Sequence, residues 1–185
     1  MIYANFFVSL HHFLLIFMLK TDQIIVLHCQ KHSDKANILH TYSLQNGRQN
    51  FILYRGHKRT GMEGGIPNVP LTILEVCYDD EKTREMKTLR SANPIFIPLA
   101  DDSEKQCVRM IIGEILYKTL RHPMADERIY QFVSFTIRQL DTAPKAQALL
   151  RPFLHHFSEL LGYGGEWVED WNDLKSLDLL REMLD

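Results

Sequence analysis

The spacing of apolar residues changes once along the chain, near residue 98, and this change limits the fold more than any other feature. Before it, apolar residues form short runs that alternate with polar ones or are rich in β-branched side chains, as strands require. After it, they recur every three or four positions, as on amphipathic helices. The strand-like runs cover residues 23–29, 36–44, 48–56, 71–78 and 84–90. Five short strands favour a small closed antiparallel barrel. The sequence therefore predicts an α+β chain in which an all-α part follows the barrel.

Turn signals separate the strands. Asn46-Gly47 predicts a tight hairpin, because both residues tolerate a positive φ angle. Polar breaks at residues 32–34 and 79–82 end the runs before them. A loop rich in Gly and Pro over residues 56–70 is long enough to be functional.

Three or four helices are expected after residue 98. Ser103 is suited to cap the first, and Pro123 ends it. The second runs from about residue 126 to 140. The third begins near Pro144, a suitable first-turn proline, and reaches Gly162. An acidic helix over 168–184 completes a helical domain of residues 99–185, after a barrel domain of residues 18–98.

The first seventeen residues stand apart, because they contain no Lys, Arg, Asp or Glu. A secretory signal needs a positively charged start, and a membrane span needs about 20 apolar residues. Polar residues such as Ser9 and His11 interrupt this segment. Three interpretations stay open for residues 1–17: a signal or anchor, a segment upstream of a true start at Met18, or an extra helix packed on the domain.

The charge of the chain is unevenly distributed. Its formal net charge of −2 argues at first against nucleic-acid binding. However, residues 31–59 hold six Lys and Arg against one Asp, whereas residues 166–185 hold seven acidic and two basic residues. Such polarity indicates separate partners or an acidic tail. The net charge therefore does not exclude nucleic-acid binding.

Motifs for catalysis are absent from the sequence. It contains neither GxGxxG nor GxxxxGK[ST], so no standard phosphate-binding loop can be named. Cys29, Cys77 and Cys107 are odd in number and lack metal-ligand spacing, which indicates reduced structural cysteines in a cytoplasmic protein. No catalytic residues, cofactor or membrane association are predicted.

Two pairs of adjacent histidines, His11-His12 and His155-His156, are poor candidates for chelating one ion. Neighbouring side chains on a helix point about 100° apart. Glu159 follows His155 by four residues, but no third ligand is evident. Structural histidines are therefore the favoured interpretation, and no metal site is predicted.

Basic residues with interleaved aromatic ones offer a more specific signal. Lys35 begins one strand, Arg48 opens the next, and Arg55, Lys58 and Arg59 follow that strand into the loop. Phe51 and Tyr54 lie among them. Barrel domains bind single-stranded nucleic acids with such cations and aromatic rings. The alternative is a solvated barrel surface with Phe51 in the core.

Several strings of the sequence resemble the bacterial RecO family of recombinational DNA-repair mediators. Their order and spacing are maintained over residues 18–164. The strings are Met18 to His28, Ser33-Asp34, Asn46-Gly47-Arg48, Arg55-Gly56-His57-Lys58-Arg59, Pro70-Leu71, Lys87 to Ala92, Gly113 to Lys118, Phe153, and Leu160 to Gly164.

This resemblance implies an OB-fold barrel, a helical domain and no catalytic turnover. It also implies binding of single- and double-stranded DNA, annealing of complementary strands, and help with RecA loading together with RecR. The helical part would bind the acidic C-terminal tail of the single-stranded-DNA-binding protein through Arg151 and Phe153. By position, the expected DNA-contacting residues are Lys35, Arg48, Arg55, Lys58, Arg59, Lys87 and Arg90.

Three departures from the family pattern affect these expectations. Many members carry a four-cysteine zinc site after the central bundle, whereas this chain has no cysteine beyond Cys107, so zinc is not expected. Members usually continue for several dozen residues past the Leu-Gly-Tyr-Gly string, whereas only residues 165–185 follow it here. Pro152, beside Arg151, also departs from the family pattern. The alternative to a mediator is a diverged interaction module that has little affinity for DNA.

Overall fold

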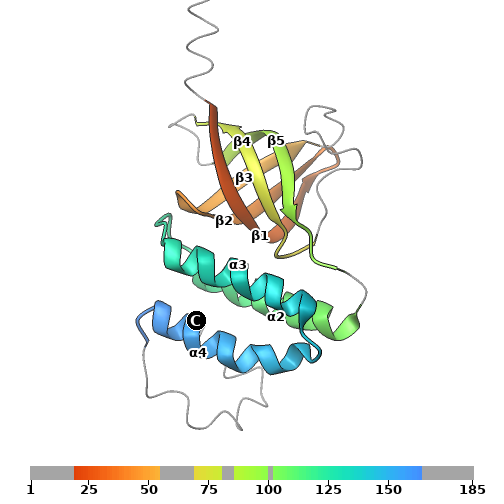
Figure 1. The fold of residues 1–185 in the computed structure, drawn as a ribbon. Coiled ribbons are helices and arrows are strands. Elements are labelled where there is room, and N and C mark those ends of the chain that lie inside the picture. Colours follow the sequence, from red (N-terminus) through yellow and green to blue (C-terminus); the bar gives the residue numbers. More distant parts are fainter. Residues whose placement is uncertain (1–18, 55–68, 81–85, 100–101, 164–185) are drawn as a thin grey trace, which may run out of the picture.

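Five strands form a closed barrel in the computed structural model, which describes residues 19–54, 69–80, 86–99 and 102–163 (Figure 1). The strand order around the barrel is β1-β2-β3-β5-β4. The strands are β1 (Leu19–Ser33), β2 (Ala36–Ser43), β3 (Gly47–Tyr54), β4 (Ile73–Asp79) and β5 (Met86–Phe96). The prediction of a five-stranded barrel followed by helices, an α+β fold of the OB type, is confirmed.

The barrel is not wholly antiparallel, in contrast to the prediction. β3 and β5 pair in parallel, with Asn50 beside Met86 and Ile52 beside Thr88, while the other neighbouring strands are antiparallel. The reason is the odd number of strands. Directions cannot alternate all the way around a closed ring of five, so at least one pair must be parallel.

The hairpin at Asn46-Gly47 is confirmed. Ser43 pairs with Gly47 across a three-residue turn, and Gly47 has a φ of 68°. A Cβ atom there would lie 2.3 Å from the carbonyl oxygen of Met124, so glycine is required. Asn46 secures the turn because its Nδ2 donates to Asp22 Oδ2 at 2.9 Å and to the Tyr78 hydroxyl at 3.2 Å.

Two groups of buried apolar residues explain why β1 contains four consecutive buried positions, Ile24 to Leu27. Side chains on a strand alternate between its two faces. Ile24 and Val26 point into the barrel with Phe51 and Leu74. Ile25 and Leu27 point outward and pack with residues of the helices. This strand therefore contributes to the barrel interior and to the contact with the helical layer.

The helices are α2 (Ser103–Thr119), α3 (Glu127–Thr142), the 3-10 helix η2 (Ala146–Leu149) and α4 (Leu150–Leu160). The predicted cap at Ser103 is wrong by one residue. Asp102 is the N-cap, and its carboxylate accepts from the backbone N–H groups of Glu104 at 2.8 Å and Lys105 at 3.4 Å. A carboxylate at this position also interacts favourably with the helix dipole.

Two predicted helix boundaries also differ from the structure. α2 ends at Thr119, before Pro123. The third α-helix begins at Leu150, because η2 occupies the residues that follow Pro144. Pro152 lies in its first turn, where a backbone N–H has no partner within the helix, so proline is accommodated there.

The helices form two layers on the barrel. α2 and α3 lie between the barrel and α4 (Figure 1). None of the helices within the described residues is long and apolar enough to cross a membrane. The predictions for residues 1–17, the loop 56–68 and the acidic helix 168–184 fall outside the described residues.

Candidate nucleic-acid interface

The outer surface of β1, β2 and β3 carries a row of partly exposed side chains, here called the outer face. It consists of His28 on β1, Ile38 and His40 on β2, and Asn50 and Ile52 on β3. The register places Ile38 beside Ile52 and His40 beside both Asn50 and His28. Residues two apart on a strand share a face, so these side chains form a continuous surface.

Three aromatic rings meet at the end of the outer face nearest the helices. The ring of Tyr117, on α2, lies 5.0 Å from that of His28 and 5.2 Å from that of His40. The two histidine rings stack at 5.9 Å. Aromatic rings so arranged present flat surfaces on which nucleic-acid bases can stack.

Arg48 also contacts Tyr117. Its guanidinium carbon is 4.6 Å from the ring centre, and its Nη1 donates to the Tyr117 carbonyl oxygen at 3.4 Å. Burial lowers the pKa of Arg48, while Tyr117 acts in the opposite direction. Among the described residues no carboxylate forms an ion pair with Arg48, so its positive charge stays available to an anion.

His40 is held by polar neighbours on both sides. Its Nδ1 and the Oδ1 of Asn50 form a hydrogen bond of 2.7 Å, and its Nε2 is 3.4 Å from Gln30 Oε1. Burial lowers the pKa of His40, the bond to Asn50 raises it, and the charges of Arg48 and His28 lower it further. The neutral form of the ring is therefore favoured near pH 7.

Lys35 lies at the tip of the β1–β2 hairpin and is exposed. Its backbone N–H donates to Ser33 Oγ at 3.3 Å, whereas its ammonium group has no ion pair within the described part of the chain. β2 and β3 run between Ala36, which pairs with Tyr54, and Tyr42, which pairs with Arg48. Lys35 and Arg48 therefore lie near opposite ends of this strand pair, about 20 Å apart at the strand rise per residue.

Lys87 and Arg90 belong to a different environment, here called the paired rim, which also includes Lys20, Asp79 and Asp80. Lys87 Nζ lies 2.9 Å from Asp80 Oδ1 and 4.8 Å from the centre of the Tyr78 ring. Arg90 Nη2 lies 2.5 Å from Asp79 Oδ2.

Lys20 adds a second cation to Asp80, at 2.5 Å. Hydrogen bonds from Lys20 and Lys87 lower the pKa of Asp80. The Asp80 carboxylate is therefore charged at neutral pH and offsets part of the positive charge of Lys20 and Lys87.

The structure thus separates the residues expected to contact DNA. Lys35 and Arg48 flank the outer face, while Lys87 and Arg90 lie in the paired rim. Arg55, Lys58 and Arg59 fall outside the described residues. The three-ring cluster was missed, although His28 and His40 lie in predicted strands, where strand alternation could have indicated that both face outward.

The two residues expected to bind the partner tail also differ from each other. Arg151 is exposed near the start of α4. Phe153 is 2% exposed, and its ring stacks on Phe132 at 5.7 Å and on Phe157 at 5.4 Å. Arg151 can meet a partner directly, whereas Phe153 supports the helical core from within.

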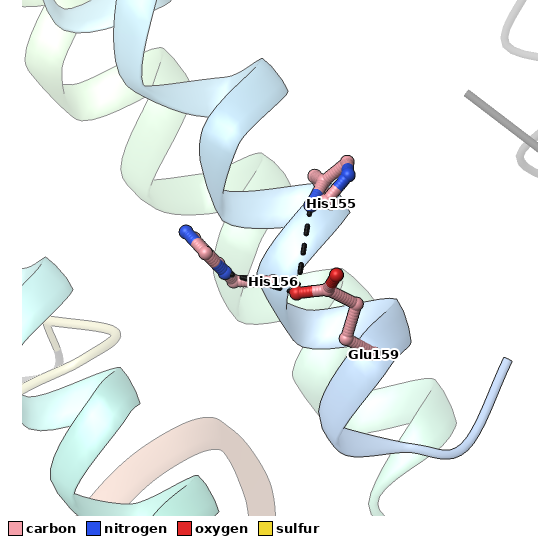
Figure 2. Close-up of side chains that lie close together, drawn as sticks. All are labelled: His155, His156 and Glu159. Atoms are coloured by element: carbon pink, nitrogen blue, oxygen red, sulfur yellow. Dashed lines mark hydrogen bonds and ion pairs between the residues drawn. The ribbon is translucent and has the colours of Figure 1, made fainter. Parts of the chain in front are cut away.

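His155, His156 and Glu159 gather on α4, as Figure 2 shows. Glu159 Oε2 lies 3.1 Å from His156 Nδ1 and 3.6 Å from His155 Nδ1. The sequence predicted that the side chains of adjacent histidines point about 100° apart and are poorly placed to chelate one ion. A carboxylate on the next turn can reach both rings.

Comparison with known proteins gives a consistent result, although no family model matches the chain. The chain is 29% identical over 169 residues to the DNA repair protein RecO of Porphyromonas gingivalis, covering 84% of this chain and 68% of that protein. It is 27% identical over 166 residues to RecO of Phocaeicola vulgatus, covering 88% and 68%. RecO of Bacteroides fragilis is 24% identical over 148 residues, covering 78% and 61%. The resemblance predicted from the sequence is confirmed.

Proposed function

We propose that this chain, a diverged relative of the RecO proteins, acts in DNA repair and recombination by binding DNA rather than by catalysis. The observation that carries the proposal is its similarity, over most of its length, to proteins named for DNA repair. The closed five-stranded barrel supports it, because barrels of this type bind oligonucleotides on the face formed by strands 2 and 3. A cytoplasmic location is part of the proposal.

In more detail, the chain binds single- and double-stranded DNA, anneals complementary strands and, with RecR, helps to load RecA. Arg151 receives the acidic tail of the single-stranded-DNA-binding protein. Exposed on α4 and far from the barrel, it leaves the outer face open to DNA at the same time.

A single strand follows the outer face between Lys35 and Arg48. The two cations bind phosphates, and bases stack on the rings of His28, His40 and Tyr117. Lys and Arg attract the phosphate backbone without reading its sequence, and rings accept any base. Such contacts give the sequence-independent binding that annealing needs.

Fluorescence anisotropy with a labelled single-stranded oligonucleotide, run over a series of salt concentrations, tests this path. In the double variant Lys35→Gln and Arg48→Gln, the slope of log affinity against log salt should become shallower. The expected change is about 0.7 for each phosphate of a single strand that the variant no longer neutralises. Affinity at low salt should fall at the same time.

The matched control is Lys145→Gln, which removes an exposed charge from the helical part and should leave the slope unchanged. Circular dichroism establishes that each variant is folded. If the parent protein binds no oligonucleotide at low salt, the proposed DNA-binding function is wrong. If it binds but the double variant keeps the parental slope, only the path along the outer face is wrong.

A second function is favoured by the paired rim. Lys87 and Arg90 are engaged by carboxylates, which reduces the positive surface that the described residues offer to DNA. A diverged protein-interaction module would keep the fold and Arg151 while binding DNA weakly. It should bind a peptide copying the acidic tail, and Arg151→Gln should weaken that binding, whereas the oligonucleotide should give no signal.

A further inference from the structure

The last two turns of α4 bring three ligand-type side chains together on its surface. His155 and Glu159 are four residues apart, and His156 and Glu159 are three apart, both spacings at which helical side chains meet. The candidate ligand atoms all lie within 4.8 Å of one another. Figure 2 shows both imidazole rings on either side of the Glu159 carboxylate.

We propose that His155, His156 and Glu159 form a binding site for one divalent transition-metal ion of the zinc class. Imidazole nitrogens and a carboxylate oxygen are ligands that Zn²⁺ accepts, and three protein ligands leave a position for water. Imidazole also suits Cu²⁺ and Ni²⁺, whereas Mg²⁺ prefers oxygen ligands. The proposal is independent of the proposed function in DNA repair.

Two of the three distances between ligand atoms are close to those of such a site, while the two imidazole nitrogens lie within 4.8 Å of each other, so one ring would turn towards a bound ion. Ligands bound at about 2.0–2.1 Å in a tetrahedral zinc site are about 3.3 Å apart. Glu159 Oε2 is 3.1 Å from one imidazole nitrogen and 3.6 Å from the other. The ion would take the place that the hydrogen bond between His156 and Glu159 now occupies.

The surroundings allow an ion to enter while limiting the motion of the ligands. The side chains of His155, His156 and Glu159 are 41%, 64% and 46% exposed, so an ion reaches them directly from solvent. The ring of His156 also contacts the ring of Phe132 edge-on at 6.1 Å. Phe132 in turn stacks on the buried Phe153, so one ligand rests on the core.

The site differs from a four-cysteine zinc site in its ligands and in its place. All three ligands lie on α4, and a bound ion would link side chains of its last two turns. This gives a readout that does not depend on DNA. Binding of Zn²⁺ should raise the thermal unfolding midpoint of the chain, because a ligand that binds only the folded state stabilises it.

Nuclear magnetic resonance of the imidazole nitrogens, with the full chain purified without a histidine tag, tests the proposal. Titration with Zn²⁺ should shift the Nδ1 resonances of His155 and His156 together and saturate at one ion per chain. Mg²⁺ should shift neither. Calorimetry should show that His156→Asn and Glu159→Gln each weaken zinc binding by more than about tenfold.

His32→Asn is the matched control, since His32 is exposed at the far end of β1 and should leave zinc binding unchanged. The proposal is overturned if millimolar Zn²⁺ shifts neither resonance. It is also overturned if the chain binds Zn²⁺ equally well in the double variant of His156→Asn and Glu159→Gln, because the ion then lies elsewhere. Each substitution replaces an exposed side chain, so folding is expected to persist, and circular dichroism checks it.

Discussion

The helical layer and the paired rim both contain ion pairs between Asp and a basic residue, but the surroundings differ. Arg109, on α2, is 2.9 Å from Asp141 on α3, and their side chains are 3% and 8% exposed. The guanidinium of Arg109 also donates to the Leu99 carbonyl oxygen at 2.9 Å. At the paired rim, the side chain of Arg90 is 49% exposed beside Asp79, which is 17% exposed.

The buried ion pair stabilises the fold, whereas the more exposed ion pairs of the paired rim are accessible to a ligand. Asp141 is surrounded by donors, because the Leu99 backbone N–H reaches its Oδ2 at 3.0 Å and Lys105 Nζ reaches its carbonyl oxygen at 2.6 Å. Exposed ion pairs contribute only about 0–1 kcal/mol. A phosphate can therefore compete with Asp79 for the half-exposed Arg90 at little cost to stability, whereas the pair of Arg109 and Asp141 is buried away from such a ligand.

The largest effect is expected when the buried pair is broken. Arg109→Met leaves the Asp141 carboxylate buried without its counter-charge, which should lower the free energy of unfolding by about 3–5 kcal/mol. Urea denaturation of the full chain measures the change. The comparison variant Arg90→Met breaks an exposed pair and should cost less than about 1 kcal/mol. Equal losses in the two variants would contradict the distinction between the two regions.

A smaller effect is expected at the paired rim, where removal of carboxylates should strengthen DNA binding. Asp79→Asn together with Asp80→Asn removes the carboxylates that engage Lys20, Lys87 and Arg90. If the chain binds DNA, these three cations can then meet phosphates in place of the two carboxylates. The salt slope for duplex DNA should then steepen by up to about 2.7, at about 0.9 for each additional phosphate neutralised. Fluorescence anisotropy over a salt series measures it.

The matched control is Asp34→Asn, which removes an exposed partner of Lys31 on the β1–β2 hairpin. The side chain of Asp34 is 95% exposed, so its loss should alter the slope much less. An unchanged slope in the double variant would show that Lys20, Lys87 and Arg90 do not bind DNA even without these two carboxylates, and would restrict binding to other residues.

The barrel could be predicted because its signals are local. Runs of β-branched residues, the Asn46-Gly47 turn and the change of period near residue 98 each lie within a few consecutive residues. The parallel pairing of β3 with β5 could not be seen in this way. It depends on closure of the whole ring, although counting five strands would have been enough to infer one parallel pair.

The candidate sites were harder to predict, because the partner of a charged residue is seldom its neighbour in sequence. Nothing near Arg48 indicates that Tyr117 lies beneath it, and nothing near Lys87 indicates that it covers Tyr78. His155, His156 and Glu159 are the contrasting case. Their spacing is visible in the sequence. However, the angle of about 100° between adjacent side chains describes the two histidines alone, and it does not indicate that Glu159, one turn later, can contact both rings.

The smallest effect concerns His40, which is half-buried beside Tyr117. Burial and the charges of Arg48 and His28 hold the pKa of His40 below its ordinary value of 6.5. The unfolded chain therefore takes up a proton at a higher pH than the folded chain does. Stability is then lost as the pH falls below about 6.5, and the loss is complete once the pH is below the folded pKa.

Comparison with His40→Gln isolates this contribution, because the glutamine does not titrate and the other groups are common to both proteins. Between about pH 7.5 and about pH 5, the free energy of unfolding should fall more steeply in the parent than in the variant. Urea denaturation at several pH values measures both curves. Parallel curves would show that half-burial beside Tyr117 does not hinder protonation of His40. The imidazole of His40 would then carry a positive charge in mild acid even in the folded chain.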